Sequence, residues 1–180
     1  MIRSSAALML LFLLCGCSHV ISESSLKLVD QSVSYRDLQT RPEAFVGKTV
    51  LVGGVIAGLE SSGDISTLEV ARLELLKNGV PDEQSRSTGR FLAVSSQLID
   101  PMFFRPGHLI TIVGEVKGRK VRKLNEADYP YPLIAIREMR QFRASEAFAP
   151  PWNPYQNQFG DEKFLGRPPG LTDGEPRREY

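Results

Sequence analysis

The residues with the most definite chemistry lie near the start of the chain, at Leu14, Cys15, Gly16 and Cys17. A cysteine with a small residue directly before it and a leucine three places before it is typical of a lipobox, in which the cysteine thiol takes up lipid. Cleavage after Gly16 would make Cys17 the first residue of the mature chain. Cys15 fits less well, because Leu14 is too large for the position before the cleaved bond. We therefore predict a lipid on Cys17, with an ordinary secretory signal or a buried N-terminal helix as the alternatives.

The segment before these residues has the composition of a signal peptide. Arg3 gives it a positive start, and residues 6–14 form an apolar run of nine residues. A helix that spans a bilayer needs roughly 20 such residues, so the run is too short for a membrane span. We predict a lipoprotein signal peptide over residues 1–16 and, over residues 17–34, the lipidated cysteine followed by a polar tether.

The mature chain offers little for catalysis. Both cysteines lie at the cleavage site, so no disulfide or thiol nucleophile is expected downstream. The two histidines, His19 and His108, are far apart in the sequence, and we expect no metal site and no cofactor. The acids available for general acid–base catalysis are Asp64, Glu69, Glu74 and Asp100. We interpret them instead as solvent-facing strand and turn residues, with Asp100 in an Asx turn, and predict that the protein is not an enzyme.

Charge argues against one large class of partner. Without Arg3 of the leader, the 22 basic residues fall to 21 and equal the 21 acidic residues. A nucleic-acid binder needs a surplus of lysine and arginine, so we expect no nucleic acid as a partner. One basic cluster is formed by Lys117, Arg119, Lys120, Arg122 and Lys123. As a basic hairpin it is a candidate contact for phosphates of lipid A or anionic headgroups. The alternative is a solvated loop whose charges discourage edge-to-edge pairing.

The elements that would position these residues are strands. Apolar runs of strand length recur with Gly, Pro and Asn between them, at residues 49–58, 65–77, 90–96, 108–116 and 133–142, with a helix as the alternative for the end of the second run. Gly53 and Gly54 suggest a bend or bulge in the first. Before it, residues 37–47 indicate a short helix or turn, with Thr40 and Glu43 at capping-box spacing. The pattern predicts an all-β domain over residues 35–148, a small OB-like barrel or sandwich of about five to six strands.

Aromatic residues mark the end of this domain and the segment after it. Residues 149–180 hold six of the 12 prolines and the only tryptophan, Trp152, without a periodic apolar pattern. We predict an extended or disordered tail. Trp152 and Tyr155 are candidate partner contacts of a recognition peptide, and Trp152 folded back onto the domain is an equal alternative. Tyr129 and Tyr131 are interpreted as a cover over the open end of the barrel, with a ligand site as the alternative.

Several motifs occur in an order that resembles one family. After the leader come PEAFVGKTVLVGG at residues 42–54, GRFLA at 89–93, LIDP at 98–101, TIVGEVKG at 111–118 and DYPYP at 128–132. Together they resemble the Slp family of starvation-inducible outer membrane lipoproteins, over residues 17–142. The resemblance implies a periplasm-facing domain held to the outer membrane of a Gram-negative bacterium, without an established biochemical activity. Ser18 also favours the outer membrane, because an aspartate at that place would resemble an inner-membrane retention signal.

Three functions follow as hypotheses. The first is a non-enzymatic outer membrane lipoprotein with a structural or assembly role in the envelope under stress or starvation, in contact with an envelope protein or lipid A. The second is an OB-like binding module for an envelope oligosaccharide or another small ligand. Exposed aromatic side chains along one barrel face would favour this module, and a closed aliphatic barrel would count against it. The third, an envelope hydrolase, requires two acids, or an acid and a histidine, that converge in a cleft.

Overall fold

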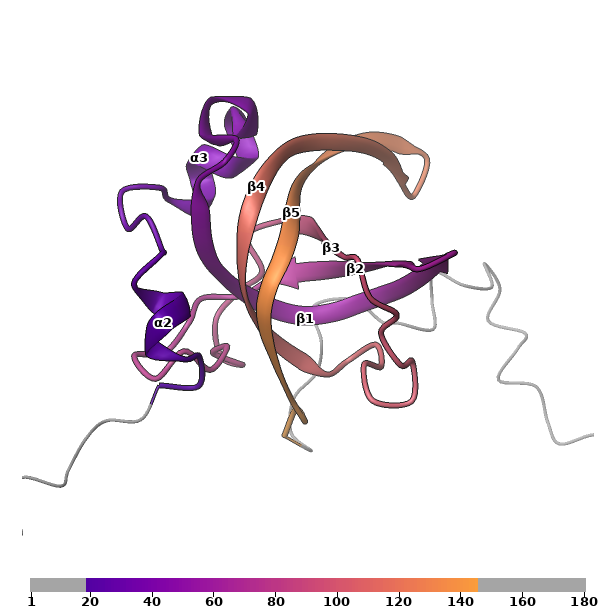
Figure 1. Ribbon diagram of the computed structural model, residues 1–180. Helices are drawn as coiled ribbons and strands as arrows, with labels where there is room; N and C mark the ends of the chain where they lie inside the picture. The colour runs from indigo at the N-terminus through magenta and orange to yellow at the C-terminus, as the bar shows by residue number, and fades with distance from the viewer. Residues whose placement is uncertain (1–18, 146–180) are drawn as a thin grey trace, which may run out of the picture.

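The computed structural model describes residues 19–145. Five strands form one closed barrel in the order β1-β2-β3-β5-β4 (Figure 1). The strands are β1 Thr49–Ser62, β2 Ile65–Arg72, β3 Arg90–Ser95, β4 Leu109–Leu124 and β5 Ala127–Phe142, and the short helices are α2 Glu23–Leu26, α3 Tyr35–Thr40 and the 3-10 helix η2 Pro42–Phe45. Neighbouring strands are antiparallel except β3 and β5. This arrangement confirms the prediction of a small all-β, OB-like barrel.

Strand β1 closes the barrel because it pairs along both of its edges. Its first half pairs with β4 and its second half with β2, and the two ladders overlap at Gly54 and Val55. A Cβ atom at Gly54 would overlap the carbonyl oxygen of Ala71, so the close approach of β1 and β2 requires glycine there. The register shifts between Ile56 and Gly58. The predicted bulge is therefore present, but it lies after the paired glycines rather than at them.

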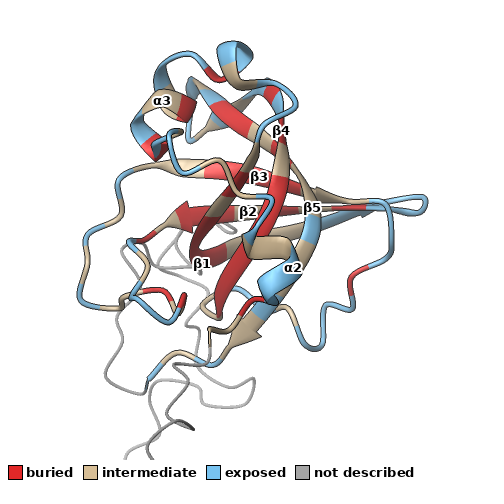
Figure 2. Cartoon of the chain, turned by 60° about the vertical axis from the view of Figure 1, so that its left-hand side comes forward, coloured by how far each residue is buried: buried red, intermediate tan, exposed pale blue. Residues whose placement is uncertain are grey.

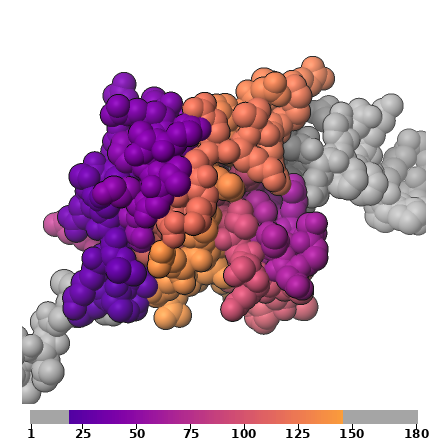
Figure 3. All heavy atoms as spheres, turned by 45° about the horizontal axis from the view of Figure 1, so that its top comes forward, coloured from indigo at the N-terminus to yellow at the C-terminus, as the bar shows by residue number. Residues whose placement is uncertain are grey.

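Strands β4 and β5 are longer than the apolar pattern predicts, at 16 residues each. Their pairing continues beyond a register shift between Val116 and Gly118 to a turn at Asn125. Residues 117–132 of this long hairpin are called the distal arm below. Figure 3, in which the top of Figure 1 comes forward, shows the distal arm in orange next to the purple region of α3 and η2 and away from the indigo start of the chain. By contrast, β2 stops at Arg72, before the end of the predicted run.

Alternate residues of the strands fill the barrel, and the buried positions gather on them in Figure 2. The core cluster includes Val50, Val52, Ile56, Leu68, Val70, Phe91, Ala93, Ile110, Ile112, Val116 and Ile134. One end is closed by Tyr35 and Leu38 of α3, and the rings of Tyr35 and Phe91 meet edge to face with 6.2 Å between centroids. The other end is closed by Ile99 and Phe104 from the loop between β3 and β4. This loop, residues 97–107, is called the near loop below.

Residues 19–34 lie on the barrel, whereas the sequence predicts a tether there. Ile21 is buried, and the amide and hydroxyl of Ser22 donate to the carboxylate of Glu138 on β5 at 3.0 and 2.6 Å. The amide of Asp30 donates to the carbonyl of the first residue of β1 at 2.8 Å. The sequence pattern missed this packing because it depends on one apolar side chain and on polar contacts with distant strands.

Helix α3 begins at a capping box, but not at the predicted one. Ser34 Oγ accepts from the amide of Asp37 at 3.2 Å, and the Asp37 carboxylate accepts from the amide of Ser34 at 3.1 Å. The predicted box of Thr40 and Glu43 is wrong. Thr40 ends α3, and Glu43 lies in η2, a separate helix without a side-chain cap. The Glu43 carboxylate binds Arg119 of the distal arm instead.

Candidate functional site

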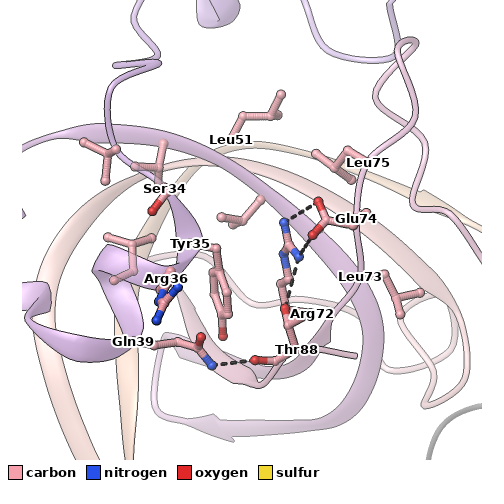
Figure 4. A pocket seen from close by; sticks show the side chains of 15 residues that line it. Ser34, Tyr35, Arg36, Gln39, Leu51, Arg72, Leu73, Glu74, Leu75 and Thr88 are labelled. Atoms are coloured by element: carbon pink, nitrogen blue, oxygen red, sulfur yellow. Dashed lines mark hydrogen bonds and ion pairs between the residues drawn. The ribbon is translucent and has the colours of Figure 1, made fainter. Parts of the chain in front are cut away.

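A cleft of about 670 Å³ lies between α3 and the first half of β1 (Figure 4). Its apolar lining includes Val33, Val50, Leu51 and Leu75, and its polar lining includes Tyr35, Gln39, Arg72, Glu74 and Thr88. Gln39 Nε2 donates to the carbonyl of Thr88 at 2.5 Å, which ties α3 to the loop between β2 and β3. The cleft is thus assembled from three segments that are far apart in the sequence.

The charged wall of the cleft is a fixed ion pair. Arg72, the last residue of β2, donates twice to the carboxylate of Glu74 and once, at 3.0 Å, to Thr88 Oγ1. Its guanidinium carbon lies 5.1 Å from the centre of the Tyr35 ring. The bonds from Arg72 hold the pKa of Glu74 below its usual value. The two charges of this pair neutralise each other, so the remaining charge of the lining is that of Arg36.

Tyr35 is a residue of the cleft whose polar group, the side-chain hydroxyl, has no hydrogen-bond partner in its surroundings. The residue is 9% exposed, and its hydroxyl has no hydrogen-bond partner among residues 19–145. Burial raises the pKa of this hydroxyl well above its ordinary value. A buried hydroxyl without a partner destabilises the fold by about 1–3 kcal/mol. A ligand that bonded to it would recover this free energy, so Tyr35 is the residue that most favours a binding role for the cleft.

The four acids Asp64, Glu69, Glu74 and Asp100 form no catalytic pair with one another in the described hydrogen bonds and ion pairs. Glu69 accepts from Arg90 at 2.6 Å and from the hydroxyl of Tyr131 at 3.1 Å. Asp100 accepts from the amide two residues further on at 2.7 Å, which confirms the Asx turn. Asp64 is exposed in the turn between β1 and β2. Together with the pairing of Glu74, these contacts give three of the four carboxylates a local structural role.

The two histidines are also bound locally. His108 Nδ1 lies 3.0 Å from the carbonyl oxygen of Phe103 and 2.6 Å from Gln141 Nε2. His19 Nδ1 accepts from the amide of Ile21 at 3.0 Å. Within the described range, no three His, Cys, Asp or Glu side chains gather in a way that would hold a metal ion.

The tyrosines before the last predicted strand lie over the barrel. Tyr131 is 1% exposed, and its ring meets that of Tyr129 edge to face with 4.6 Å between centroids. The hydroxyl of Tyr129 accepts from the amide of Arg90 at 3.1 Å, and burial raises the pKa of Tyr131. On β2 and β3 the one aromatic residue is Phe91, which lies in the core. These two strands therefore lack the exposed aromatic face that would favour an oligosaccharide groove.

The five basic residues predicted at a hairpin tip lie along β4, in the distal arm. Four of them make ion pairs: Lys117 with Glu115 at 2.5 Å, Arg119 with Glu43, Arg122 with Glu60 at 2.9 Å, and Lys123 with Asp128 at 2.8 Å. Lys120 makes no ion pair within the described part of the chain. Most of this positive charge is therefore compensated within the protein, and the contact with phosphates stays a prediction.

A surface feature that the sequence reasoning missed lies in the near loop. Leu98, Met102 and Phe103 are 64%, 67% and 66% exposed. Apolar residues of these types are ordinarily counted as core. The available signal was the placement of the Met-Phe pair between Pro101 and Pro106, because a segment with prolines on both sides favours a turn over a strand.

Three of the predicted site residues, Cys17, Trp152 and Tyr155, lie outside the described residues. So do the signal peptide of residues 1–16 and the tail of residues 149–180. Among the helices of the described part, none has the length and apolar character needed to cross a membrane.

Comparison with known proteins identifies relatives. The model of a family described as the outer membrane lipoprotein Slp family matches residues 14–166. The outer membrane protein Slp of Escherichia coli is 24% identical over 161 residues, which cover 89% of this chain and 85% of that protein. An uncharacterized lipoprotein of the same organism, YeaY, is 24% identical over 122 residues, which cover 68% of this chain and 63% of that protein.

Among solved structures, a mitochondrial single-stranded DNA binding protein of S. cerevisiae is 8% identical and has a TM-score of 0.36. The match covers 55% of this chain and 99% of that chain. This likeness carries no argument about function.

Proposed function

The chain belongs to the outer membrane lipoprotein Slp family, and from this premise we propose that it is anchored in the outer membrane by a lipid on Cys17. The barrel faces the periplasm of a Gram-negative bacterium. Its role is non-enzymatic, structural or in assembly of the envelope under stress or starvation.

The observation that carries this proposal is the short path from Cys17 to the folded domain. His19 follows Cys17 by two residues, and the next amide, of Val20, donates to the carbonyl of Asn78 at 2.9 Å. Ile21 is 2% exposed. Two residues span at most about 7 Å. A lipid on Cys17 would therefore hold the barrel directly against the membrane surface.

A non-enzymatic role is supported by the use of the polar groups. Arg72 and Glu74 pair with each other, Glu69 is bound by Arg90, and Asp100 holds its own turn. Each of these groups stabilises the fold where a catalytic acid or base would have to face a substrate. The contact surfaces that we propose for an envelope protein or lipid A are the cations of the distal arm and, in the tail, Trp152 and Tyr155.

The anchor is tested by mass spectrometry of the N-terminal peptide from the membrane fraction. We expect acyl chains on Cys17, and loss of outer-membrane fractionation in the Cys17→Ser variant. A protease added to intact and to permeabilised cells tests the orientation. A periplasmic barrel is cleaved only after permeabilisation, and cleavage in intact cells would contradict the proposed orientation.

The contact surfaces are tested by in-cell crosslinking of two forms, the full chain and one that stops at Phe148. A partner captured only by the full chain assigns the contact to the tail. The same partner from both forms assigns it to the barrel. No protein partner from either form would favour a small ligand.

The second candidate function is a small-ligand module that uses the cleft, and the unpaired hydroxyl of Tyr35 favours it. The ligand we propose is an oligosaccharide or another small envelope molecule with hydroxyl groups, because the paired Arg72 and Glu74 offer it hydrogen bonds rather than a net charge. Titration with envelope oligosaccharides, monitored by protein NMR, tests it. Shifts confined to α3 and the first half of β1, lost in Tyr35→Phe, would support the module.

A further inference from the structure

We propose that the near loop is a second membrane contact. In this proposal Leu98, Met102 and Phe103 insert into the bilayer leaflet that holds the acyl chains of Cys17. The inference rests on the proposed lipid anchor and adds to it a defined orientation of the barrel on the membrane.

The exposed apolar side chains are concentrated in one short stretch. Three of the eight large apolar side chains that are exposed among residues 19–145 fall within residues 98–103. The others are spread over separate elements, as at Val46 and Val121. Single exposed apolar residues are normal on a protein surface, whereas a cluster marks a contact with a membrane or another apolar surface.

The near loop is held rigidly, so the exposure of these side chains is part of the fold. Ile99, 4% exposed, inserts into the core, and its amide donates to the buried Ser66 Oγ at 2.9 Å. The amides of Phe103 and Phe104 both donate to the carbonyl of Asp100 at 3.1 Å. Because Ile99 and Phe104 hold the near loop at the core, Phe103 could turn inward only if these hydrogen bonds and core contacts were broken.

The near loop and the start of the described chain both come close to the first residues of β4. The near loop leads directly into β4, and the amide of Gly107 donates to the carbonyl of Ile56 at 2.9 Å. The start of the chain packs beside Gly79, whose carbonyl accepts from the hydroxyl of Thr111, the third residue of β4, at 2.6 Å. Along the chain, Gly107 at the end of the near loop and Thr111 beside the chain start are four residues apart, or roughly 13 Å. In Figure 1 the chain start lies at the lower left and the near loop at the lower right, whereas the distal arm lies at the top.

The charges of the near loop fit a membrane interface. Asp100 already accepts from an amide of its own turn. Arg105 donates through Nε to the carbonyl of Met102 at 2.8 Å, and the residue is exposed. An exposed guanidinium directly behind inserted apolar side chains lies at the level of the headgroup phosphates, where it binds favourably.

The test uses the lipidated full chain with a single cysteine, Phe103→Cys. Cys15 lies in the signal peptide and Cys17 carries the lipid, so the new thiol is the one that reacts. Val121→Cys is the matched control, because Val121 is also an exposed apolar residue, at 56%, but lies in the distal arm. Each thiol carries a polarity-sensitive fluorophore, and the protein is reconstituted into vesicles of phosphatidylethanolamine and phosphatidylglycerol that contain a lipid-borne quencher. We expect a blue shift and quenching at position 103, and water-like emission at position 121.

The possible failures are distinguishable. If mass spectrometry shows lipid on Cys17 and the protein floats with the vesicles, but both positions emit as in water, the insertion is wrong and the anchor stands. If Cys17 carries no lipid, both the anchor and the insertion are wrong. If position 103 crosslinks to itself in detergent without vesicles, or is shielded only when an envelope protein is added, a second copy or a protein partner occupies the loop and the proposal is overturned.

Discussion

The two ends of the barrel are closed in the same way but present opposite surfaces. At one end Ile99 and Phe104 of the near loop enter the core, and at the other end Tyr35 and Leu38 of α3 do so. The near loop leaves three apolar side chains exposed, whereas the distal arm beside α3 leaves charges that are mostly paired. The buried hydroxyl groups at the two ends differ in whether they have a hydrogen-bond partner. The buried Ser66 of the near end has its partner, and the buried hydroxyl of Tyr35 does not.

This difference teaches that cations and apolar residues are not equivalent evidence for a membrane contact. Cations that lie beside carboxylates form a surface of low net charge, so a headgroup phosphate is attracted to it less strongly than to the same cations alone. Exposed apolar side chains have no such internal partner. The chain enters beside the first residues of β4, and the near loop leads into the same strand, so the proposed anchor and the apolar surface can face one leaflet.

The largest expected effect is a difference in the free energy of unfolding between substitutions at two adjacent residues of the near loop, Ile99 and Leu98. Ile99→Ala removes a buried side chain and should lower the free energy of unfolding by about 2–5 kcal/mol. Leu98→Ala, at an exposed neighbour, should change it by no more than about 0.5 kcal/mol. Urea unfolding followed by circular dichroism, on the chain without its leader, measures both. Equal effects would mean that the near loop does not close the barrel as described.

The next effect concerns the hydrogen bond that fixes this loop. Ser66→Ala leaves the amide of Ile99 buried without an acceptor, which should lower the free energy of unfolding by about 1–3 kcal/mol. Ser95 is the matched control because it pairs with Ser66 in the β2–β3 ladder and is less buried. Ser95→Ala should have a smaller effect in the same urea titration. A neutral Ser66→Ala would contradict the rigid attachment of the near loop.

At the other end of the barrel, removal of a buried hydroxyl should raise the free energy of unfolding instead of lowering it. Tyr35→Phe removes a buried hydroxyl that has no partner, so we expect a gain of about 1 kcal/mol in the free energy of unfolding. Tyr131→Phe, by contrast, removes a donor to Glu69 and should destabilise. Thermal unfolding of the two variants measures the difference. Destabilisation by Tyr35→Phe would show that its hydroxyl has a partner in solution.

The barrel itself could be predicted from the sequence because each strand of its body carries a local signal. Residues 90–96 and 108–116 are short apolar runs bounded by Gly, Pro or Ser, and both became buried strands. The distal arm lacks this signal. Its charges fall on neighbouring positions and hide the alternation, so the sequence predicts a loop or hairpin tip where β4 continues.

The two functional surfaces could not be predicted because they depend on contacts between distant residues. The cleft exists where α3 packs beside Arg72 and Thr88, and no local pattern links these positions. In the near loop, Leu98 and Ile99 have nearly the same chemistry, and one is exposed while the other is buried. Which of them enters the core is decided by the partner at Ser66, a contact across 33 residues of sequence.

Acid should loosen the contact that holds the entering chain along the barrel. The bonds from Lys48, at 2.8 Å, and from Ser32 lower the pKa of Asp30 from 3.8 to about 2. Because the folded state binds this proton less readily than the unfolded state, the stabilisation is complete above about pH 4 and is lost as the pH falls through about 2. Asp30→Asn should flatten the pH dependence of the melting temperature in this window. Asp64→Asn, in an exposed turn, is the control and should leave the dependence as in the parent chain.

The smallest expected effect is that of Lys120→Glu on vesicle binding. A large effect there would assign the membrane contact to the distal arm instead of the near loop. Lys120 makes no ion pair within the described residues and lies in the distal arm, away from the entering chain. We therefore expect Lys120→Glu to leave the binding of the chain without its leader to anionic vesicles unchanged, whereas Phe103→Ser weakens that binding. Cosedimentation at low and high salt measures both, since a contact between exposed charges is screened by salt and an apolar insertion is not. A salt-sensitive loss in Lys120→Glu, with Phe103→Ser unchanged, would place the membrane at the distal arm, because only a leaflet facing that end could sense the reversed charge.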